Sequence, residues 1–341
     1  MEFWLISTAH LEDRLLFKDS EDFKVGMNYV AVQTYKAGIN VLAFILMSNH
    51  AHFVVEGSRS QAEAFIYSFK GYYSRYLGKK YGVQEFLRKN DVDVRPIPFD
   101  NEPLGRAIAY VQMNCVAANI CTHPVEYTWG TGATFFPMSE KRGKLLKDLS
   151  ARERYRLLHT KADLPESWMI FDDGYISPAS YVSKDYVEAI FRTPKRMNFF
   201  LQNSSKAKQR LEMGEACLPA FSDQTIIAAL PELCRTLFQK SSVDALNEEQ
   251  LVELLRQLRF RFSSNVNQLA RITGLSYVYQ RSQCRDRCPS EHRCAYAIYS
   301  YQTDQFHLQR RHHSHQGVPS RLGRRVFPAH TDQVLALYNA E

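Results

Sequence analysis

Apolar residues in the first part of the chain are grouped in short runs of the kind that buried strands produce. Three runs have a β-rich composition: residues 3–9, 41–46 and 50–55. The turn-forming pair Ser48 and Asn49 separates the last two runs, so residues 41–55 predict a β-hairpin. Residues 92–99 alternate apolar with charged positions and contain two prolines, which predicts an edge strand because proline donates no ladder hydrogen bond.

Helical spacing fills the intervals between these strands. Three segments are predicted as helices: residues 20–38, 60–81 and 104–120. The first has a capping serine, Ser20, followed by the acidic residues Glu21 and Asp22, and it ends at Gly38. The resulting order β-α-β-β-α-β-α predicts an α+β domain over residues 1–140, with helices packed on an antiparallel sheet.

The remainder of the chain has a different pattern. Residues 141–240 predict a mainly helical connecting region, broken by proline and glycine. Residues 241–285 predict a second compact unit that is all-α. Residues 286–341 are rich in Arg, His and Gln, and they predict a basic, loosely ordered tail.

Composition and charge narrow the class of function. The 341 residues are 45% hydrophobic and 23% charged, which excludes wholesale disorder, and the formal net charge is +7. Residues 1–140 carry 13 Lys and Arg residues against 15 Asp and Glu residues, so the excess of positive charge lies in residues 141–341. A basic, aromatic-rich chain favours a nucleic-acid partner, and general affinity for duplex DNA is expected from the C-terminal half.

Cysteine usage and hydropathy indicate the compartment. The seven cysteines are odd in number and mostly scattered, and the first residues lack a secretory hydrophobic region, which predicts a reduced, cytoplasmic protein. The longest strongly apolar run, residues 41–47, is far shorter than the roughly 20 residues that cross a bilayer. No membrane partner is expected.

The segment Met47 to Val55 contains the strongest candidate for chemistry. Side chains alternate along a strand, so His50 and His52 project from the same face, about 7 Å apart at a rise of ~3.3 Å per residue. Two imidazoles in this arrangement can converge on one divalent ion. For an isolated His-x-His motif, a pair of solvated or core histidines is the ordinary interpretation, and only the surrounding sequence favours a metal site.

A second candidate lies on the helix predicted over residues 104–120. Tyr110 and Asn114 are separated by four positions and therefore share one helical face. An amide oxygen suits Mg²⁺ or Mn²⁺, and a tyrosine hydroxyl is a potential nucleophile. By itself this spacing is a very weak signal, and a packed tyrosine with a surface asparagine is its ordinary interpretation.

These segments form one ordered pattern that resembles a known family. Its parts are Arg14-Leu15-Leu16-Phe17, Asp22-Phe23, residues 41–55, Phe69-Lys70 and residues 110–116. Over residues 1–136 the pattern resembles the HUH-type single-tyrosine transposases, specifically their REP-associated tyrosine transposase branch. His50-Ala51-His52 matches the histidine–hydrophobic–histidine motif of that family, and Tyr110 and Asn114 match its tyrosine and polar ligand. Cys115 departs from the pattern, because that branch usually has proline there.

The resemblance implies a fold and an activity. It implies a ferredoxin-like HUH nuclease domain in which His50, His52 and Asn114 hold Mg²⁺ or Mn²⁺. It also implies that Tyr110 attacks a DNA phosphodiester, becomes linked to the 5′ phosphate and releases a 3′ hydroxyl, so that strands can be cleaved and rejoined. The expected substrate is single-stranded or hairpin DNA, and the protein is expected to act as a monomer or a homodimer.

A track for the substrate strand is expected on the helix predicted over residues 60–81. Four cations lie among its aromatic residues: Lys70, Arg75, Lys79 and Lys80. Cations interleaved with rings are typical of single-strand binding surfaces. An amphipathic helix with core aromatics and a solvated cationic face is the alternative.

The C-terminal helical unit contains a candidate duplex-binding element. Residues 266–276 predict a short helix, a Thr-Gly turn and a helix that begins at Ser276, which resembles the helix-turn-helix of replication-initiator proteins. In that arrangement Arg271, Gln280 and Arg281 are the candidate DNA contacts. A generic helical hairpin is the alternative, since the pattern is loose.

Four metal-type ligands are also grouped near residue 290. They are Cys284, Cys288, His292 and Cys294. Zinc binding is conceivable, although the spacing fits no standard zinc motif.

Two other functions remain compatible with the sequence. One is a DNA-binding regulator or domesticated protein that keeps the fold without turnover. The other is a replication or conjugation nickase, which uses the same metal motif. The position of the tyrosine after the histidine motif and the absence of a helicase P-loop favour a transposase.

Overall fold

The computed structural model describes most of the chain. The described residues are 1–8, 15–82, 92–137, 141–206, 221–262, 264 and 266–275. They belong to a compact unit that spans Met1–Cys288. Several predictions lie outside the described residues: those for Arg14, Gln280, Arg281, the Cys284/Cys288/His292/Cys294 group and the 286–341 tail.

Four strands form the main sheet. They are β1 (Phe3–Thr8), β2 (Asn40–Met47), β3 (His50–Glu56) and β4 (Val92–Ile97). Their spatial order is β2-β3-β1-β4, and every neighbouring pair is antiparallel. β2 and β3 form the predicted hairpin, with Met47 paired to His50 across the two-residue turn. β4 is the predicted edge strand.

Four helices accompany this sheet. They are α1 (Ser20–Ala37), α2 (Arg59–Tyr81), α3 (Asn101–Gln112) and the short α4 (Asn114–Ala117). α1 begins at a side-chain cap from Asp19 and ends at Gly38, whose φ of 59° lies in the left-handed region that glycine adopts freely. α2 begins with a capping box between Ser58 and Gln61. The order β1-α1-β2-β3-α2-β4 with this strand pairing is the ferredoxin-like arrangement, and the α+β class is confirmed.

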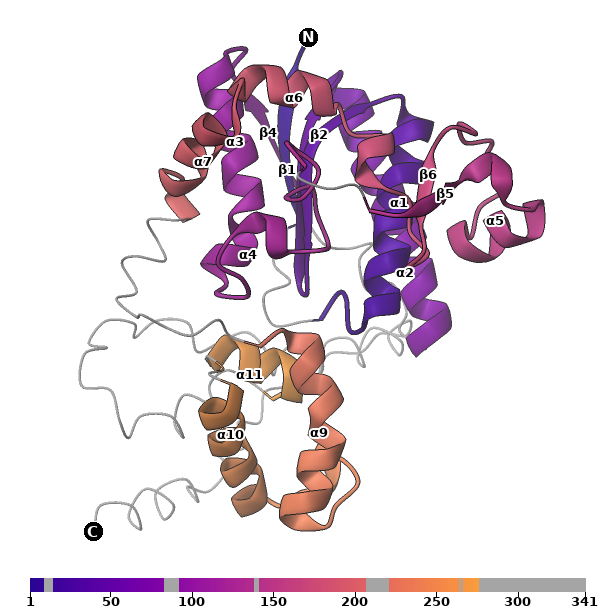
Figure 1. Ribbon diagram of the computed structural model, residues 1–341. Helices are drawn as coiled ribbons and strands as arrows, with labels where there is room; N and C mark the ends of the chain where they lie inside the picture. Colours follow the sequence, from indigo (N-terminus) through magenta and orange to yellow (C-terminus); the bar gives the residue numbers. More distant parts are fainter. Residues whose placement is uncertain are drawn as a thin grey trace, which may run out of the picture. The chain divides into compact units, whose positions relative to one another are not determined.

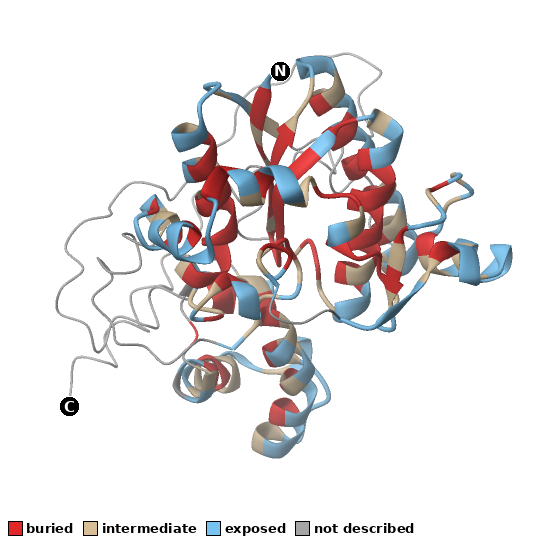
Figure 2. Cartoon of the chain, turned by 45° about the horizontal axis from the view of Figure 1, so that its top comes forward, coloured by how far each residue is buried: buried red, intermediate tan, exposed pale blue. Residues whose placement is uncertain are grey.

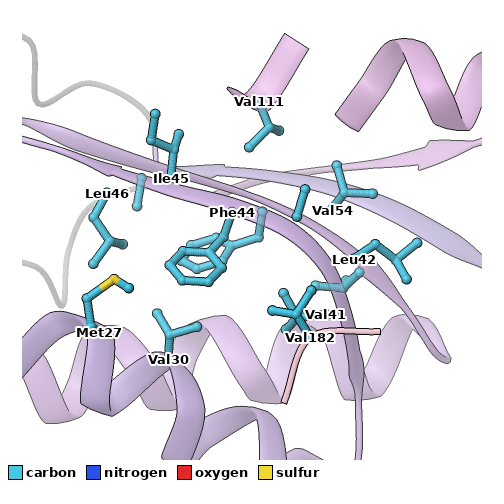
Figure 3. Packing of buried hydrophobic residues seen from close by; sticks show 14 of the residues in the cluster. Met27, Val30, Val41, Leu42, Phe44, Ile45, Leu46, Val54, Val111 and Val182 are labelled. Carbon is cyan, nitrogen blue, oxygen red and sulfur yellow. The ribbon is translucent and has the colours of Figure 1, made fainter. Parts of the chain in front are cut away.

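The helices cover the two faces of the sheet unequally. α1 and α2 pack on each other and on one face, and α3 packs on the other (Figure 1). Phe44 and Phe53 point toward α1 and α2, whereas Ile45 and Val54 point toward Val111 of α3 (Figure 3). Buried residues therefore line both surfaces of the sheet and the inner faces of the helices (Figure 2).

The outer edge of β2 is protected by later parts of the chain. The backbone N–H of Leu46 donates to Trp129 O at 2.8 Å, and the Thr131 N–H donates to Phe44 O at 3.0 Å. Gly130 lies between them, where an added Cβ would come within 2.8 Å of the Phe44 carbonyl oxygen. Glycine is required here because the two backbones approach too closely for a side chain.

Residues 141–206 add further elements to the same core. They are β5 (Gly143–Leu145), α5 (Ala151–Leu158), β6 (Met169–Phe171), α6 (Lys184–Phe191) and α7 (Pro194–Gln202), with short 3₁₀ turns at Leu146–Asp148 and Pro178–Ser180. Another 3₁₀ turn, Pro124–Glu126, precedes this region. β5 and β6 pair as a small antiparallel sheet, which the helical expectation for residues 141–240 did not include. One hydrophobic cluster runs from Phe3 to Leu201, so the core continues past residue 140.

Three helices form a second hydrophobic cluster. They are α9 (Asp223–Phe238), α10 (Glu248–Phe262) and α11 (Val266–Thr273), with a 3₁₀ turn at Val243–Ala245. Leucine and isoleucine side chains from all three helices, including Ile226, Leu254 and Leu269, are buried together. This cluster includes α9, which the sequence analysis assigned to the connecting region. Gly274 follows α11 with a φ of 71°, as expected for a turn, and the helix predicted from Ser276 lies outside the described residues.

Candidate active site

The two histidines lie on the face of the sheet that α3 covers. His52 of β3 pairs with Ile45 on one side and with Ser7 of β1 on the other. Because directly paired residues point to the same face of a sheet, His52 and Ser7 share that face, and His50 shares it by alternation. The two imidazole centroids are 4.8 Å apart. The predicted pair therefore converges.

Each imidazole is oriented by an oxygen from a neighbouring residue. His52 Nδ1 lies 2.6 Å from Ser7 Oγ, and His50 Nδ1 lies 2.8 Å from Asn49 Oδ1. Metal-binding histidines characteristically use one ring nitrogen for such a contact, which fixes the ring and leaves the other nitrogen to the metal. The sequence analysis did not single out Ser7, because it comes from a strand that is distant along the chain.

The environment keeps both rings uncharged near neutral pH. Burial and the positive charge of Lys206 lower the pKa of His50 to about 4. Burial, the neighbouring His50 and Lys206 hold the pKa of His52 well below its usual value. Neutral imidazole is the form that binds metal ions, so the electrostatics suit a metal ligand pair.

Tyr110 of α3 and Asn114 of α4 face the two histidines across the space between the sheet and these helices. The Tyr110 ring centroid is 5.6 Å from that of His52, and the Asn114 side chain is hydrogen-bonded to His50. Asn114 Nδ2 donates to the carbonyls of Tyr110 and Val111, at 2.9 and 3.1 Å. These bonds occupy the amide nitrogen, so the amide oxygen is the atom that accepts the hydrogen bond from His50, and a cation would take up this oxygen in place of that bond.

The helix predicted as continuous over residues 104–120 is divided at this point. α3 ends at Gln112, Met113 caps it, and α4 begins at Asn114. An asparagine that hydrogen-bonds back to the preceding turn competes with regular helix geometry, which accounts for the break.

The donor set fits a small divalent cation. Among the described residues no group of three His, Cys, Asp or Glu side chains is placed to hold a metal ion. The candidate ligands are His50, His52 and Asn114, which offer two neutral imidazoles and one amide oxygen. Nitrogen and oxygen donors of this kind suit Mn²⁺, and Mg²⁺ less usually, while leaving coordination positions to substrate oxygens.

Charged residues that the sequence analysis did not select also surround Tyr110. Lys206, which follows α7, places its Nζ 5.2 Å from the centroid of the Tyr110 ring. Asp93 and Arg95 of β4 are ion-paired at 2.6 Å, and their charges also act on Tyr110. Asp93 pairs with Ser7, which places it on the same sheet face as the histidines. Only strand register and helix packing bring these residues together, and no local pattern indicates them.

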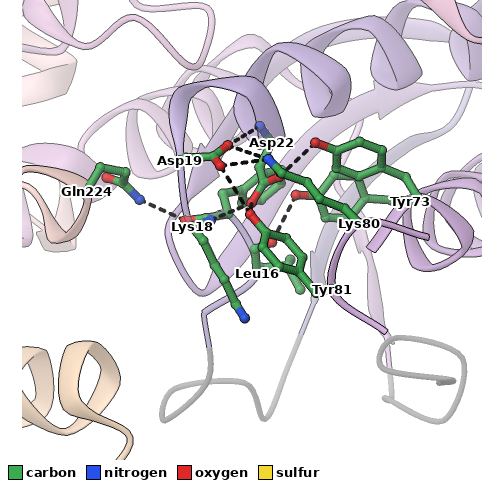
Figure 4. Close-up of polar contacts among 10 residues, drawn as sticks. Leu16, Lys18, Asp19, Asp22, Tyr73, Lys80, Tyr81 and Gln224 are labelled. Atoms are coloured by element: carbon green, nitrogen blue, oxygen red, sulfur yellow. Dashed lines mark hydrogen bonds and ion pairs between the residues drawn. The ribbon is translucent and has the colours of Figure 1, made fainter. Parts of the chain in front are cut away.

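The predicted DNA track on α2 is only partly exposed. Arg75 and Lys79 are exposed, and the Arg75 guanidinium lies over the Tyr72 ring at 4.3 Å. Lys70 is 2% exposed, so its amine is not on the surface. Lys80 is bound by Asp19 and Asp22, at 2.6 and 2.8 Å, within a network of polar contacts (Figure 4).

Arg271 occupies a structural position. Its guanidinium forms an ion pair with Asp223 of α9 at 3.0 Å, and the two side chains are only 16% and 3% exposed. This pair fastens α11 to the start of α9. The corresponding positions 280 and 281 of the predicted helix-turn-helix lie outside the described residues.

Comparisons with known proteins give limited information. No protein-family model matches the chain, and no curated protein matches it. A solved structure described as a REP-associated tyrosine transposase bound to a REP hairpin is similar over 38% of this chain and 76% of that chain, with 12% sequence identity and a TM-score of 0.29. None of the described helices has the length and apolar character needed to cross a membrane.

Proposed function

We propose that this protein is a metal-dependent DNA strand transferase of the HUH single-tyrosine type. The observation that supports the proposal is the convergence of four side chains on one face of the sheet. The His50 and His52 rings are 4.8 Å apart, the Tyr110 ring is 5.6 Å from His52, and Asn114 is hydrogen-bonded to His50. A tyrosine beside a neutral donor set is the arrangement that attack on a phosphodiester requires.

His50, His52 and Asn114 would hold the divalent cation, Mn²⁺ or Mg²⁺. When bound, the cation polarises a phosphate oxygen and stabilises the charge that develops during in-line displacement. The chain contributes orientation, because Ser7 and Asn49 fix the two rings and the carbonyls of the preceding turn fix the Asn114 amide.

Tyr110 supplies the nucleophile. Partial burial raises the pKa of its hydroxyl, so the group is a neutral phenol before reaction. Attack forms the bond from the tyrosine oxygen to phosphorus and breaks the bond to the 3′ oxygen, which leaves as a hydroxyl after taking a proton from water. The phenol proton passes to solvent. The phosphotyrosine conserves the bond energy, so a second 3′ hydroxyl can reverse the step and rejoin strands.

The proposed substrate class rests on the resemblance of His50-Ala51-His52, Tyr110 and Asn114 to the HUH single-tyrosine family, which implies single-stranded or hairpin DNA. Arg75 and Lys79 remain exposed on α2, but α2 packs on the sheet face opposite to the histidines, so they would contact the strand only away from the reacting phosphate. The helical C-terminal part, through its predicted helix-turn-helix, would add affinity for duplex DNA.

A covalent-adduct assay tests the proposal. The full chain is incubated with labelled hairpin-bearing single-stranded DNA and Mn²⁺, and protein–DNA adducts are separated on a denaturing gel. We expect an adduct from the wild type, its complete loss in Tyr110→Phe, and its retention in Tyr67→Phe, which alters an exposed tyrosine of α2. An adduct that survives Tyr110→Phe would contradict the assignment of the nucleophile. DNA binding without any adduct would instead support a regulator that lacks turnover.

A further inference from the structure

Lys206 is brought to the candidate site by the packing of α7 on α3. α7 contacts the length of α3, and Gly105 of α3 allows the Phe200 ring to lie close to its backbone. The residues after α7 are held by side-chain bonds to the last turn, from Asn203 Nδ2 to Phe199 O and from Ser204 Oγ to Leu201 O, both at 2.8 Å. This segment places Lys206 Nζ 5.2 Å from the Tyr110 ring centroid.

Lys206 brings a positive charge beside the candidate nucleophile, with its Nζ over the Tyr110 ring. Within the described part of the chain, no carboxylate forms an ion pair with Lys206, whereas Arg95, whose charge lowers the pKa of Tyr110, is paired with Asp93 at 2.6 Å. The charge of Lys206 is therefore the one that the described site leaves uncompensated.

This arrangement is unfavourable without an anionic ligand. Lys206 is partly buried, and burial lowers its pKa because the ammonium loses hydration. Its ring contact in the site is with Tyr110, and the cation–π attraction there replaces only part of that hydration. A phosphate oxygen that enters beside Tyr110 would supply both the opposite charge and a charge-assisted hydrogen bond.

We propose that Lys206 binds a non-bridging oxygen of the phosphate that Tyr110 attacks. This inference rests on the proposed function and assigns the Lys206 ammonium, in addition to the metal ion, to the reacting phosphate. The ammonium keeps its proton throughout, so Lys206 stabilises the developing negative charge and does not act as the base for the phenol. The bonds made and broken are those of the Tyr110 attack itself.

Adduct kinetics test the role in catalysis. Lys206→Met removes the charge with little change in length, Lys206→Arg keeps the charge, and Lys195→Met removes an exposed charge of α7 as the matched control. We expect Lys206→Met to slow adduct formation by about 100-fold, as the loss of a preorganised donor to a transition state does. Lys206→Arg should retain a rate within about 10-fold of the wild type, and Lys195→Met should be unchanged. An Arg variant as inactive as the Met variant would overturn the proposal in favour of a proton-transfer role.

Binding without cleavage tests the phosphate contact independently. In the Tyr110→Phe background, fluorescence anisotropy with a single-stranded oligonucleotide and Mn²⁺ should show about 10-fold weaker binding for Lys206→Met than for Lys195→Met. Equal affinities for these two variants would overturn the proposal. A circular dichroism spectrum of each variant checks that it is folded, and Lys206→Gln provides a second, polar substitution at the same position. A wild type that forms no adduct would refute the proposed function, while the binding comparison still decides whether Lys206 contacts phosphate.

Discussion

At the scale of single residues, the orientation of the candidate ligands depends on partners that carry no chemistry themselves. The alternation of strand β3 places His50 and His52 on one face, and Ser7 Oγ and Asn49 Oδ1 then fix the rings through Nδ1. Asn114 is held by backbone carbonyls of the last turn of α3. The sequence motif identifies the donors, and these hydrogen bonds determine which atom of each donor faces the site.

Removal of the Ser7 hydroxyl tests this orientation. Ser7→Ala should weaken Mn²⁺ binding by about 10-fold or more, because the His52 ring loses the contact that fixes its tautomer and angle. Isothermal titration calorimetry on the full chain measures the affinity. Ser60→Ala removes an exposed hydroxyl of α2 and serves as the control. Equal Mn²⁺ affinities for the two variants would contradict a positioning role for Ser7.

At the scale of elements, the start of α1 and the end of α2 are joined by a polar network (Figure 4). The Asp22 side chain is fully buried, and it accepts hydrogen bonds from Lys80 Nζ, Tyr76 OH and Tyr81 OH at 2.8–2.9 Å. Partial burial raises the pKa of Asp19, but the hydrogen bond and charge of Lys80 outweigh it, so the net direction is downward. Burial alone would lower the pKa of Lys80, but the hydrogen bonds of Lys80 to Asp19 and Asp22 outweigh burial, so the net effect is a raised pKa.

Lys80→Met should therefore destabilise the fold in a pH-dependent way. Loss of the ammonium leaves the buried Asp22 carboxylate with only neutral hydrogen-bond donors. The free energy of unfolding should therefore fall by about 2 kcal/mol near pH 7. This loss is smaller than that expected for a fully buried ion pair, because Lys80 is partly exposed. The contribution of Asp19 to this difference should decline below about pH 4, since its lowered folded pKa stabilises the protein only while the carboxylate is ionised. Urea unfolding from pH 7 down to pH 3 measures it, with Lys79→Met as the exposed neighbour control. A difference that grows as pH falls would be inconsistent with the ion pair.

At the scale of the whole molecule, the described residues contain two separate hydrophobic clusters. One extends from Phe3 to Leu201 around the sheet, and the other joins α9, α10 and α11. The second cluster has its own polar fastening, in which Asp223 accepts hydrogen bonds from Gln268 Nε2 at 2.8 Å and from Arg271 Nε at 3.0 Å. Separate cores predict that the three helices open without unfolding the sheet.

Asp223→Asn provides a direct test of that independence. The substitution leaves the mostly buried Arg271 without its counter-charge and should lower the stability of the helical cluster by about 3 kcal/mol. Hydrogen exchange of the full chain, followed by mass spectrometry, should show faster exchange in peptides from α9 and α11 and unchanged exchange in β1 and β3. Uniformly faster exchange throughout the chain would indicate one cooperative unit instead.

Local features of the sequence determined the hairpin, the limits of α1 and α2 and the candidate donors, but not the limits of α3. Apolar runs around Ser48-Asn49 define β2 and β3, and Gly38 ends α1, because turn geometry and burial act over a few residues. The His-x-His and Tyr-x₃-Asn spacings likewise follow from the periods of a strand and a helix. The convergence of the two motifs required α3 to pack on the sheet face that carries His50 and His52.

Only the tertiary structure decided which charged residues are available for function. Lys70 and Lys80 have the composition of a DNA track, yet one is buried and the other is paired with carboxylates from α1. Arg271 is used to fasten two helices. Lys206, far along the chain from Tyr110, reaches the site because α7 packs on α3. A charge acquires its role from neighbours that folding brings from elsewhere in the chain, and sequence spacing does not contain that information.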